Sequence, residues 1–313
     1  MSNLLITGAN GYIGSALALE LTLATNHIVR ASVRKKTIKL PSQIQVIENM
    51  EVSDDTNWTD TLQDIDVVIH CAARVHIMEE KSQNSILEFK KINTDGTLNL
   101  ARQAASLGVK RFIFLSTIGV NGAETINHPF KADDIAKPYS LYSKSKLEAE
   151  IGLKKISEET NMAIVIIRPP LVYGPNAPGN FSTLLRFMKW RMPLPLGAIN
   201  NKRSFIFLGN LVDLIIRCIE HPNAENQIFL VSDDHDISTT QLLQNVRKAL
   251  KKFTLLLPIP MNILSLIARY SGNERMAQQL LGSLEIDIKK TKLLLGWKPP
   301  FNIFEALEKT VRR

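Results

Sequence analysis

The chain has 313 residues, of which 45% are hydrophobic, and its 38 basic and 30 acidic residues give a net charge of +8. This composition excludes a disordered chain, because disordered chains have too few apolar residues to build a core. The length predicts one large or two modest domains. The positive charge suits an anionic ligand, but the densest basic block, Arg34-Lys35-Lys36, is short, so nucleic-acid binding is not expected.

The two cysteines and the most apolar segment bear on where the protein works. Cys71 and Cys218 lie in apolar segments, which predicts reduced core thiols and a cytoplasmic location. The chain opens directly into an apolar strand, so a signal peptide is not expected. Residues 255–264 are very apolar but too short and too rich in proline for a membrane span. They predict buried packing, with a weak membrane-surface or dimer contact as the alternative.

A glycine turn opens the chain. An apolar strand ending at Thr7 runs into Gly8, Gly11 and Gly14, and from Tyr12 the apolar pattern becomes helical. Glycine lets backbone N–H groups approach a phosphate, and the helix dipole favours the anion. The turn therefore predicts a pyrophosphate site, with a glycine-rich turn that binds nothing as the alternative.

Strands and helices alternate after this turn. Strands are predicted at residues 4–7, 27–33, 44–47, 66–71, 111–116 and 163–168, and helices from residue 12, at 86–107 and at 139–160. This alternation is typical of right-handed βαβ units. It predicts an α/β fold with a doubly wound parallel sheet of the Rossmann type, whose ligands bind beyond the carboxyl ends of the strands.

The pattern changes after Arg168, where prolines and short loops dominate. Helices are predicted at residues 208–220, 239–251 and 262–270, with a short strand at 228–231. We expect a Rossmann domain at residues 1–170 and a smaller, mostly helical C-terminal region at 171–313. The segment near 203–232 is expected to return to the main sheet.

One tyrosine and one lysine carry the predicted chemistry. Tyr142 and Lys146 stand four residues apart in a predicted helix, so they share one face. An ammonium beside a phenol favours the ionised phenol and lowers its pKa, which predicts a general acid or base near neutral pH. An ordinary exposed Tyr/Lys pair is the alternative. Ser116 and Thr117 argue against it, since they would project from a strand end to the same sheet edge.

Several spaced motifs resemble the extended short-chain dehydrogenase/reductases, in particular the nucleotide-sugar (UDP-sugar) epimerase/dehydratase group, over nearly the whole chain. Tyr142 and Lys146 match the family's Y-x-x-x-K, and residues 114–122 resemble its hydroxyl motif with Thr117 at the catalytic position. Residues 168–175 resemble its R-P-x-x-V-Y-G-P turn. The resemblance implies that Tyr142 exchanges a proton with the sugar C4 oxygen, that Thr117 hydrogen-bonds the same oxygen, and that Lys146 holds the nicotinamide ribose.

The resemblance also predicts which residues hold the cofactor and the substrate. The cofactor residues are Gly8, Asn10, Gly11, Tyr12, Ile13, Arg34, Glu51, Val52, Ala72, Ala73, Asn93, Tyr142, Lys146 and Pro169. The substrate residues are Ser116, Thr117, Asn180 and Arg203, the last of which resembles an arginine that holds the substrate diphosphate. A helix cap is the alternative role for Asn180. No metal site is expected, because no cluster has metal-ligand spacing.

The end of the second strand bears on the choice of cofactor. NAD-dependent enzymes usually place an acidic residue there to bind the ribose hydroxyls. This chain has Arg34, which can pair with a 2′-phosphate. NADP is therefore expected, with NAD as the alternative; a solvated basic loop is the alternative for Arg34 itself.

Three functions follow from these residues. Ile118 and Gly119 stand where dehydratases of the group carry Asp-Glu, so dehydration is not expected. A 4-keto reductase that consumes NAD(P)H is slightly favoured by Arg34, and a UDP-sugar 4-epimerase with tightly bound NAD is the alternative. A catalytically silent NAD(P)-sensing protein is the alternative of another class. The resemblance further implies a role in polysaccharide biosynthesis and a homodimer formed by the helices at 84–107 and 140–160.

Overall fold

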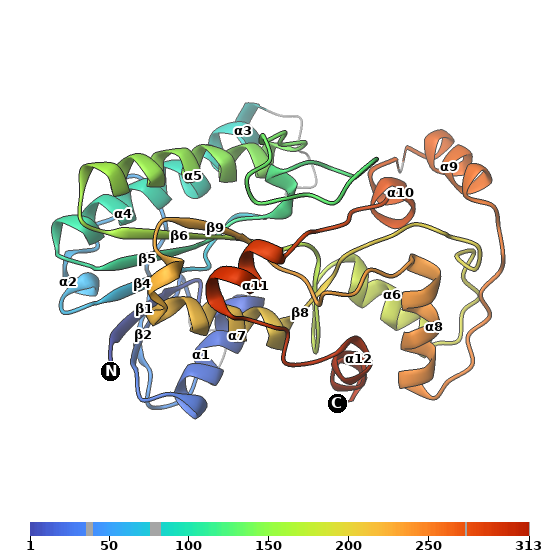
Figure 1. The fold of residues 1–313 in the computed structure, drawn as a ribbon, viewed down its shortest axis with the longest axis horizontal. Coiled ribbons are helices and arrows are strands. Elements are labelled where there is room, and N and C mark those ends of the chain that lie inside the picture. The colour runs from blue at the N-terminus through green and yellow to red at the C-terminus, as the bar shows by residue number, and fades with distance from the viewer. Residues whose placement is uncertain (36–39, 76–82, 273, 313) are drawn as a thin grey trace.

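The computed structural model describes residues 1–35, 40–75, 83–272 and 274–312. Within them, a seven-stranded parallel sheet and the helices that cover it form the larger part of the molecule (Figure 1). Its order is β3 (Gln45–Ile47), β2 (Ile28–Ser32), β1 (Asn3–Thr7), β4 (Val67–His70), β5 (Arg111–Leu115), β6 (Ala163–Arg168) and β9 (Gln227–Leu230). This confirms the predicted doubly wound parallel sheet.

The strand order reverses between β1 and β4. The chain moves outward from β1 through β2 to β3, then returns to β4 on the other side of β1. Thr7 and His70, the last residues of β1 and β4, lie opposite each other in the register. Ligands of doubly wound sheets bind at such a reversal, so the predicted site lies where this topology requires it.

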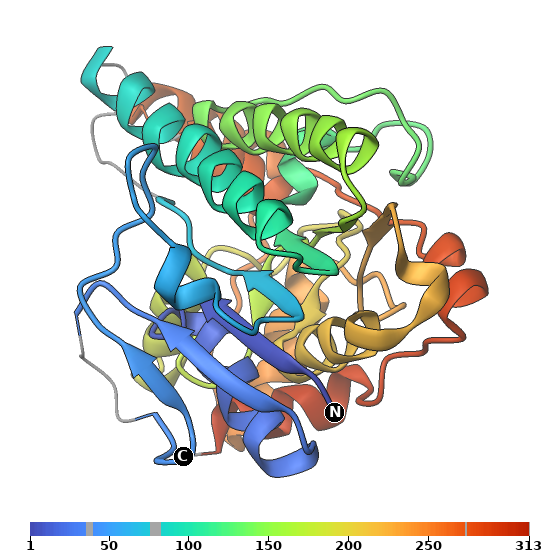
Figure 2. The ribbon, with the colours of Figure 1, turned by 90° about the vertical axis from the view of Figure 1, so that its left-hand side faces the viewer.

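Helices cover both faces of the sheet, as Figure 2 shows end-on. On one face α1 (Tyr12–Ala24), α7 (Leu208–Glu220) and α11 (Lys289–Leu295) share a core, and on the other α2 (Thr59–Leu62), α4 (Gly96–Ser106) and α5 (Leu141–Glu159) share a second one. All side chains of β4 and β5 are buried. Their continuous apolar runs are typical of strands covered on both faces.

The helix predicted at 86–107 is divided into three parts. It begins as α3 (Gln83–Phe89), passes through a π-helical segment (Lys90–Asp95) and continues as α4. The predicted single helix was therefore wrong in its middle. Short π-helical segments are frequent at functional sites, and this one contains Asn93.

The smaller region is mostly helical, as predicted. It contains α6 (Asn180–Lys189), α8 (Thr239–Leu250), α9 (Met261–Tyr270), α10 (Glu274–Leu281), α12 (Ile303–Val311) and a two-stranded sheet of β7 (Val172–Tyr173) and β8 (Ile206–Phe207). They pack around a third core that includes Tyr173. β9 lies beside β6, and α7 packs on α1. The division at residue 170 stays a prediction.

Candidate active site

The glycine turn is shaped by close contacts with the backbone. Gly8 has a φ of +70°, and a Cβ on it would lie 2.7 Å from the backbone of Ala72. A Cβ on Gly14 would lie 2.3 Å from the Gly8 carbonyl oxygen. No side chain caps the N-terminus of α1, where Gly11 stands. A helix end of this kind binds anions through its free N–H groups, so the turn fits the diphosphate of a dinucleotide.

The other predicted cofactor residues lie around this turn. The Asn10 side chain donates to the Lys35 carbonyl at 2.9 Å and ties the turn to the end of β2. Arg34 and Glu51 are exposed, and the half-buried Ala72 and Ala73 follow β4. These positions surround the carboxyl ends of β1, β2 and β4, where a dinucleotide would lie. Ile13 is half-buried in the first turn of α1, and Val52 is buried.

Tyr12, at the start of α1, has a side chain whose polar atom is left without a partner in the described part of the chain. Its hydroxyl is buried and has no hydrogen-bond partner among the described residues. A Cβ on Gly174 would lie 2.8 Å from that oxygen, so Tyr12 reaches from the turn to the segment after β7. Burial raises the pKa of Tyr12, which keeps the phenol neutral. An unpaired buried hydroxyl is costly, and a bound ligand is one way to satisfy it.

A neutral histidine links the strands under the site. The Thr7 hydroxyl and the His70 Nδ1 are 2.6 Å apart, and the His70 Nε2 lies 3.0 Å from the Thr97 hydroxyl. Thr97 donates its only proton to the Asn93 carbonyl, so His70 must donate from Nε2 and accept from Thr7 at Nδ1. Burial, with a smaller effect of Lys146, lowers the pKa of His70 to about 3. The imidazole is therefore a fixed, uncharged connector.

Asn93 holds the segment after β4 against α5. Its Oδ1 accepts from the Arg74 N–H at 2.8 Å, and its Nδ2 donates to the Arg74 carbonyl at 3.0 Å and to the Ser145 hydroxyl at 3.1 Å. Both amide protons are thus used within the protein. Asn93 supports the site from below, and the signal that leads to it is the resemblance alone.

Lys146 joins α5 to the end of β5. The helix begins at a capping box formed by Ser140 and Ser143, which fixes the first turn that carries Tyr142. One turn later the Lys146 Nζ donates to the Leu115 carbonyl at 2.8 Å and lies 4.3 Å from the centre of the Phe114 ring. The lysine is almost completely buried. The predicted convergence of α5 with the carboxyl end of β5 is therefore present.

Thr117 stands opposite the first turn of α5. Its hydroxyl accepts from the Gly119 N–H at 3.2 Å, and the Ile118 N–H is held by the Pro169 carbonyl at 2.9 Å. A Cβ on Gly119 would lie 3.3 Å from the Ser143 Cβ and 3.5 Å from the Thr117 hydroxyl. The small glycine lets this turn pack closely against the residue that follows Tyr142.

The pKa of Tyr142 shifts in the direction opposite to the prediction. Burial, with a smaller effect of Tyr139, raises it above the ordinary value of tyrosine. Burial also lowers the pKa of Lys146 to about 7. Its ammonium is directed to the Leu115 carbonyl, and Lys146 is not among the groups that shift Tyr142. Ionisation of the phenol therefore requires further positive charge near it.

Ser116 does not offer its hydroxyl to a substrate. The side chain is 4% exposed, and its hydroxyl donates to a Glu150 carboxylate oxygen at 2.5 Å. Glu150 forms a two-pronged ion pair with Arg168, which also donates to the Asn121 side chain at 3.0 Å. The predicted substrate contact is corrected here to a structural one. Ser116 anchors the strand end that carries Thr117.

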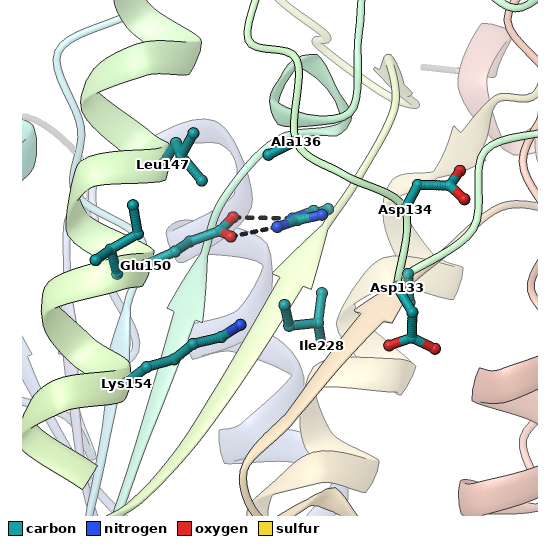
Figure 3. A pocket seen from close by; sticks show the side chains of 10 residues that line it. Asp133, Asp134, Ala136, Leu147, Glu150, Lys154 and Ile228 are labelled. Carbon is teal, nitrogen blue, oxygen red and sulfur yellow. Dashed lines mark hydrogen bonds and ion pairs between the residues drawn. The ribbon is translucent and has the colours of Figure 1, made fainter. Parts of the chain in front are cut away.

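The ion pair of Glu150 lines a hollow of about 330 Å³ behind the site (Figure 3). The dashed lines from Glu150 in the figure mark the pair, and Asp133 and Asp134 lie on the opposite wall. Thr117, Tyr142 and Lys146 are not part of its lining. This hollow is therefore separate from the candidate active site.

Arg203 lies shortly before β8, in the smaller region. It is almost buried, and it donates to the Gly282 carbonyl at 2.8 Å. Burial lowers the pKa of Arg203, and Tyr139 opposes this effect. Tyr139 also acts on the pKa of Tyr142, and its ring would lie 3.0 Å from a Cβ on Gly119. Tyr139 therefore lies close enough to Arg203 and to Tyr142 to affect both pKa values, and no sequence pattern points to it.

Asn180 has a different environment. It is exposed, stands at the first position of α6 after the cap residue Gly179, and donates to the Gln279 side chain of α10 at 2.9 Å. The alternative role as a helix cap is wrong, because Gly179 takes that position. A substrate contact of Asn180 stays a prediction.

Among the described residues there is no group of three or more His, Cys, Asp and Glu side chains that could hold a metal ion.

Comparisons with known proteins decide the family. The profile described as "NAD dependent epimerase/dehydratase family" matches residues 4–232. The chain belongs to this family. It is 42% identical over 312 residues to the UDP-glucose 4-epimerase of Vibrio cholerae, which covers 99% of this chain and 94% of that protein. The protein is thus an enzyme of the NAD-dependent epimerase/dehydratase family of extended short-chain dehydrogenase/reductases, as the motifs implied.

Solved structures show the same fold. The UDP-N-acetylglucosamine 4-epimerase from Methanobrevibacter ruminantium M1 has a TM-score of 0.81 at 22% identity and covers 99% of this chain and 97% of its own. The UDP-glucose 4-epimerase from Thermotoga maritima, with UDP-glucose, has a TM-score of 0.79 at 21% identity, with the same coverage. The likeness of these family members to the chain extends through the smaller region as well as the sheet.

Proposed function

We propose that this family member is a UDP-sugar 4-epimerase that keeps NAD bound. The observation that carries the proposal is the 42% identity, along almost the whole chain, to a protein named UDP-glucose 4-epimerase. The site is compatible with it, because Thr117 lies opposite the turn of α5 that presents Tyr142, while Lys146 joins α5 to the end of β5. The 4-keto reductase, our first expectation from sequence, becomes the second candidate.

The chain's own residues divide the work at C4 of the sugar. When bound, NAD would supply the acceptor for the C4 hydride and, in its oxidised form, positive charge beside the site. Tyr142 takes the proton of the C4 hydroxyl as the C4–H bond breaks, and it returns a proton when the bond forms again on the opposite face. The Thr117 hydroxyl donates to the C4 oxygen. Arg203 is proposed to hold the substrate diphosphate.

A cofactor balance tests this proposal. The purified protein is incubated with UDP-glucose without added cofactor, and UDP-galactose is measured by chromatography. An epimerase forms it catalytically, because the hydride returns to the sugar. A parallel incubation of a UDP-4-keto sugar with NADPH measures cofactor oxidation. Consumption of NADPH without epimer formation would replace the epimerase by the reductase, and no product in either reaction would favour the sensing protein.

Arg34 is the observation that favours the second candidate. It is exposed directly after Val33 at the end of β2, where no carboxylate is present to bind a ribose diol. A guanidinium there is suited to the 2′-phosphate of NADPH, the cofactor of a reductase. Titration of the cofactor-free protein with NAD and NADP separates the two proposals.

We also infer a homodimer formed through α4 and α5. Ile151 on α5 is 61% exposed, and Leu107 at the end of α4 is also exposed, which leaves apolar surface on both predicted dimer helices. Light scattering on the purified protein tests this inference.

Cys71 and Cys218 are both unpaired, in line with the proposed cytoplasmic location. A role in polysaccharide biosynthesis remains a proposal from the resemblance.

A further inference from the structure

Helix α9 turns an apolar face toward solvent. Ile263, Leu266, Ile267 and Tyr270 are spaced as one helical face and are 49–86% exposed. The opposite face, with Met261 and Leu264, packs against the core of the smaller region. In a surface helix the apolar stripe normally faces the core. An apolar stripe that faces outward marks an interaction surface.

The apolar surface continues along the segment before α9. Phe253, Leu255 and Leu257 alternate outward and are each at least 38% exposed, whereas Thr254 is completely buried. The Leu194 backbone holds this segment in an extended form through bonds to Leu255 and Leu257. Figure 1 shows it running along the edge of the smaller region farthest from the sheet, up to α9. We call the seven exposed side chains the α9 strip: Phe253, Leu255, Leu257, Ile263, Leu266, Ile267 and Tyr270.

The sequence stretches that carry the strip and the neighbouring α6 are basic. Residues 171–212 and 237–272 contain no Asp or Glu, but each stretch contains five Lys or Arg residues. Lys251 and Lys252 directly precede the strip, and Arg269 lies within it on α9. The Lys252 ammonium reaches the Lys189 carbonyl at 3.4 Å, which brings the end of α6 beside the end of α8.

Two exposed aromatic rings stand among these cations. Trp190, directly after α6, is 64% exposed, and the Arg186 guanidinium lies 5.4 Å from its ring centre. The Arg247 guanidinium lies 5.7 Å from the Phe253 ring centre. Exposed Trp and Phe rings beside Arg and Lys are typical of surfaces that enter the headgroup region of a bilayer.

We propose that the α9 strip docks this protein on an anionic phospholipid surface. Apolar side chains on an amphipathic helix enter the acyl boundary, and flanking cations pair with negatively charged headgroups. A second copy of the chain on the same face would bring exposed cations such as Lys251, Lys252 and Arg269 against their own copies, so charge complementarity selects the lipid. α9 has ten residues, which is too short to cross a bilayer, and no described helix is long and apolar enough to do so. The helix therefore lies in the surface plane.

Vesicle flotation tests the docking surface. The full chain is mixed at low salt with vesicles of phosphatidylcholine alone or with phosphatidylglycerol added. We expect flotation with the mixed vesicles, weak flotation with the neutral ones, and release by high salt. Equal flotation with both, or none with either, overturns the proposal.

Two pairs of variants separate the strip from general surface effects. Leu266→Glu places a charge on the exposed face without touching the core and is expected to lower vesicle binding about tenfold or more. Its control is Leu293→Glu on α11, which is 83% exposed and is expected to bind like the wild type. Lys251→Glu with Lys252→Glu should lower binding more than the matched Lys154→Glu with Lys155→Glu on α5.

Light scattering on the same samples shows whether the α9 strip is instead a contact between two copies of the chain. If Leu266→Glu changes the oligomeric state and leaves flotation unchanged, the strip is a contact between copies and the lipid proposal is wrong. If Leu293→Glu and Leu266→Glu lose binding equally, the strip has no special role and the proposal is also wrong. Epimerase activity on a water-soluble UDP-sugar should be unchanged in every variant, because none alters the candidate active site.

Discussion

The sheet region and the smaller helical region differ in which kinds of side chain they bury and which they expose. Under the candidate active site, charged and polar side chains are buried in hydrogen-bonded networks, such as that of Ser116, Glu150, Arg168 and Asn121. At the outer edge of the helical region, apolar side chains are exposed and the surrounding sequence contains cations without acids. The first arrangement holds the strand end that carries Thr117 in place, and the second leaves apolar surface exposed.

This difference indicates how the two regions divide the function. The glycine turn, Thr117, Tyr142 and Lys146 belong to the sheet region, and their geometry depends on buried contacts that tolerate little change. Arg203 and the α9 strip belong to the helical region and are proposed to bind the substrate diphosphate and a lipid surface. Variants in the sheet region should therefore lose stability or turnover, whereas variants in the helical region should change binding.

The largest expected effect comes from the buried ion pair. Arg168→Met leaves the Glu150 carboxylate buried without its partner, so the free energy of unfolding should fall by about 3–5 kcal/mol. Urea denaturation measures it. The matched control is Arg312→Met, which breaks an exposed pair with Glu308 and should cost less than about 1 kcal/mol. Equal losses in the two variants would show that burial does not distinguish the regions.

The next effect concerns substrate binding in the helical region. Arg203→Met removes a buried guanidinium proposed to bind the diphosphate, so the KM for UDP-glucose should rise about 10–100-fold, in line with a charge-assisted hydrogen bond. NAD binding should stay unchanged. Lys202→Met, next to it but exposed, serves as the control. A fall in kcat or NAD affinity with an unchanged KM would place Arg203 in the catalytic region.

The buried His70 should make the stability of the sheet region depend on pH. Its pKa is lowered from 6.5 to about 3 in the folded protein, so between these values the unfolded chain binds the proton and the folded chain does not. Stability should therefore fall as pH decreases from 6.5 towards 3, with a slope of up to about 1.4 kcal/mol per pH unit from this group. Denaturation of wild type and His70→Gln at several pH values measures it; the exposed His128→Gln is the control. An unchanged slope in His70→Gln would contradict the neutral connector.

Arg34 should show the smallest effect. It is exposed, so Arg34→Ala should weaken NADP binding by about tenfold or less, since exposed charge pairs contribute little, and leave NAD binding and stability unchanged. Calorimetric titration with both cofactors measures this. Loss of NAD affinity in the variant would mean that Arg34 contacts a part of the cofactor common to both.

Much of the sheet region could be predicted from its patterns. Apolar runs such as Val67-Val68-Ile69 locate buried strands, and the glycine spacing locates the turn, because local backbone geometry alone requires these residues. The π-helical segment around Asn93 could not be predicted, since it depends on tertiary bonds from Asn93 to Arg74 and Ser145. The short helices α6, α10, α11 and α12 were also missed, because prolines and short apolar patterns surround them.

The site was predicted less well than the fold for an electrostatic reason. A helix pattern places a charged residue such as Glu150 toward solvent, and only the packing of Arg168 against it reveals a buried pair. The sequence could therefore not show that the Ser116 hydroxyl donates to Glu150 and is not offered to a substrate. The direction of the Tyr142 shift likewise depends on burial, which outweighs the lysine four residues away. The signal that could have found Glu150 is its spacing of four from Lys146.

The most direct test of the account is the turnover of Tyr142→Phe. The variant is compared with wild type for conversion of UDP-glucose to UDP-galactose, and bound nucleotide is measured after denaturation of each protein. Tyr270→Phe, at an exposed tyrosine, is the control. Loss of the acid/base should lower kcat by about 10²–10⁴-fold while bound nucleotide stays at the wild-type level. Near-normal turnover of Tyr142→Phe would contradict the proposed chemistry.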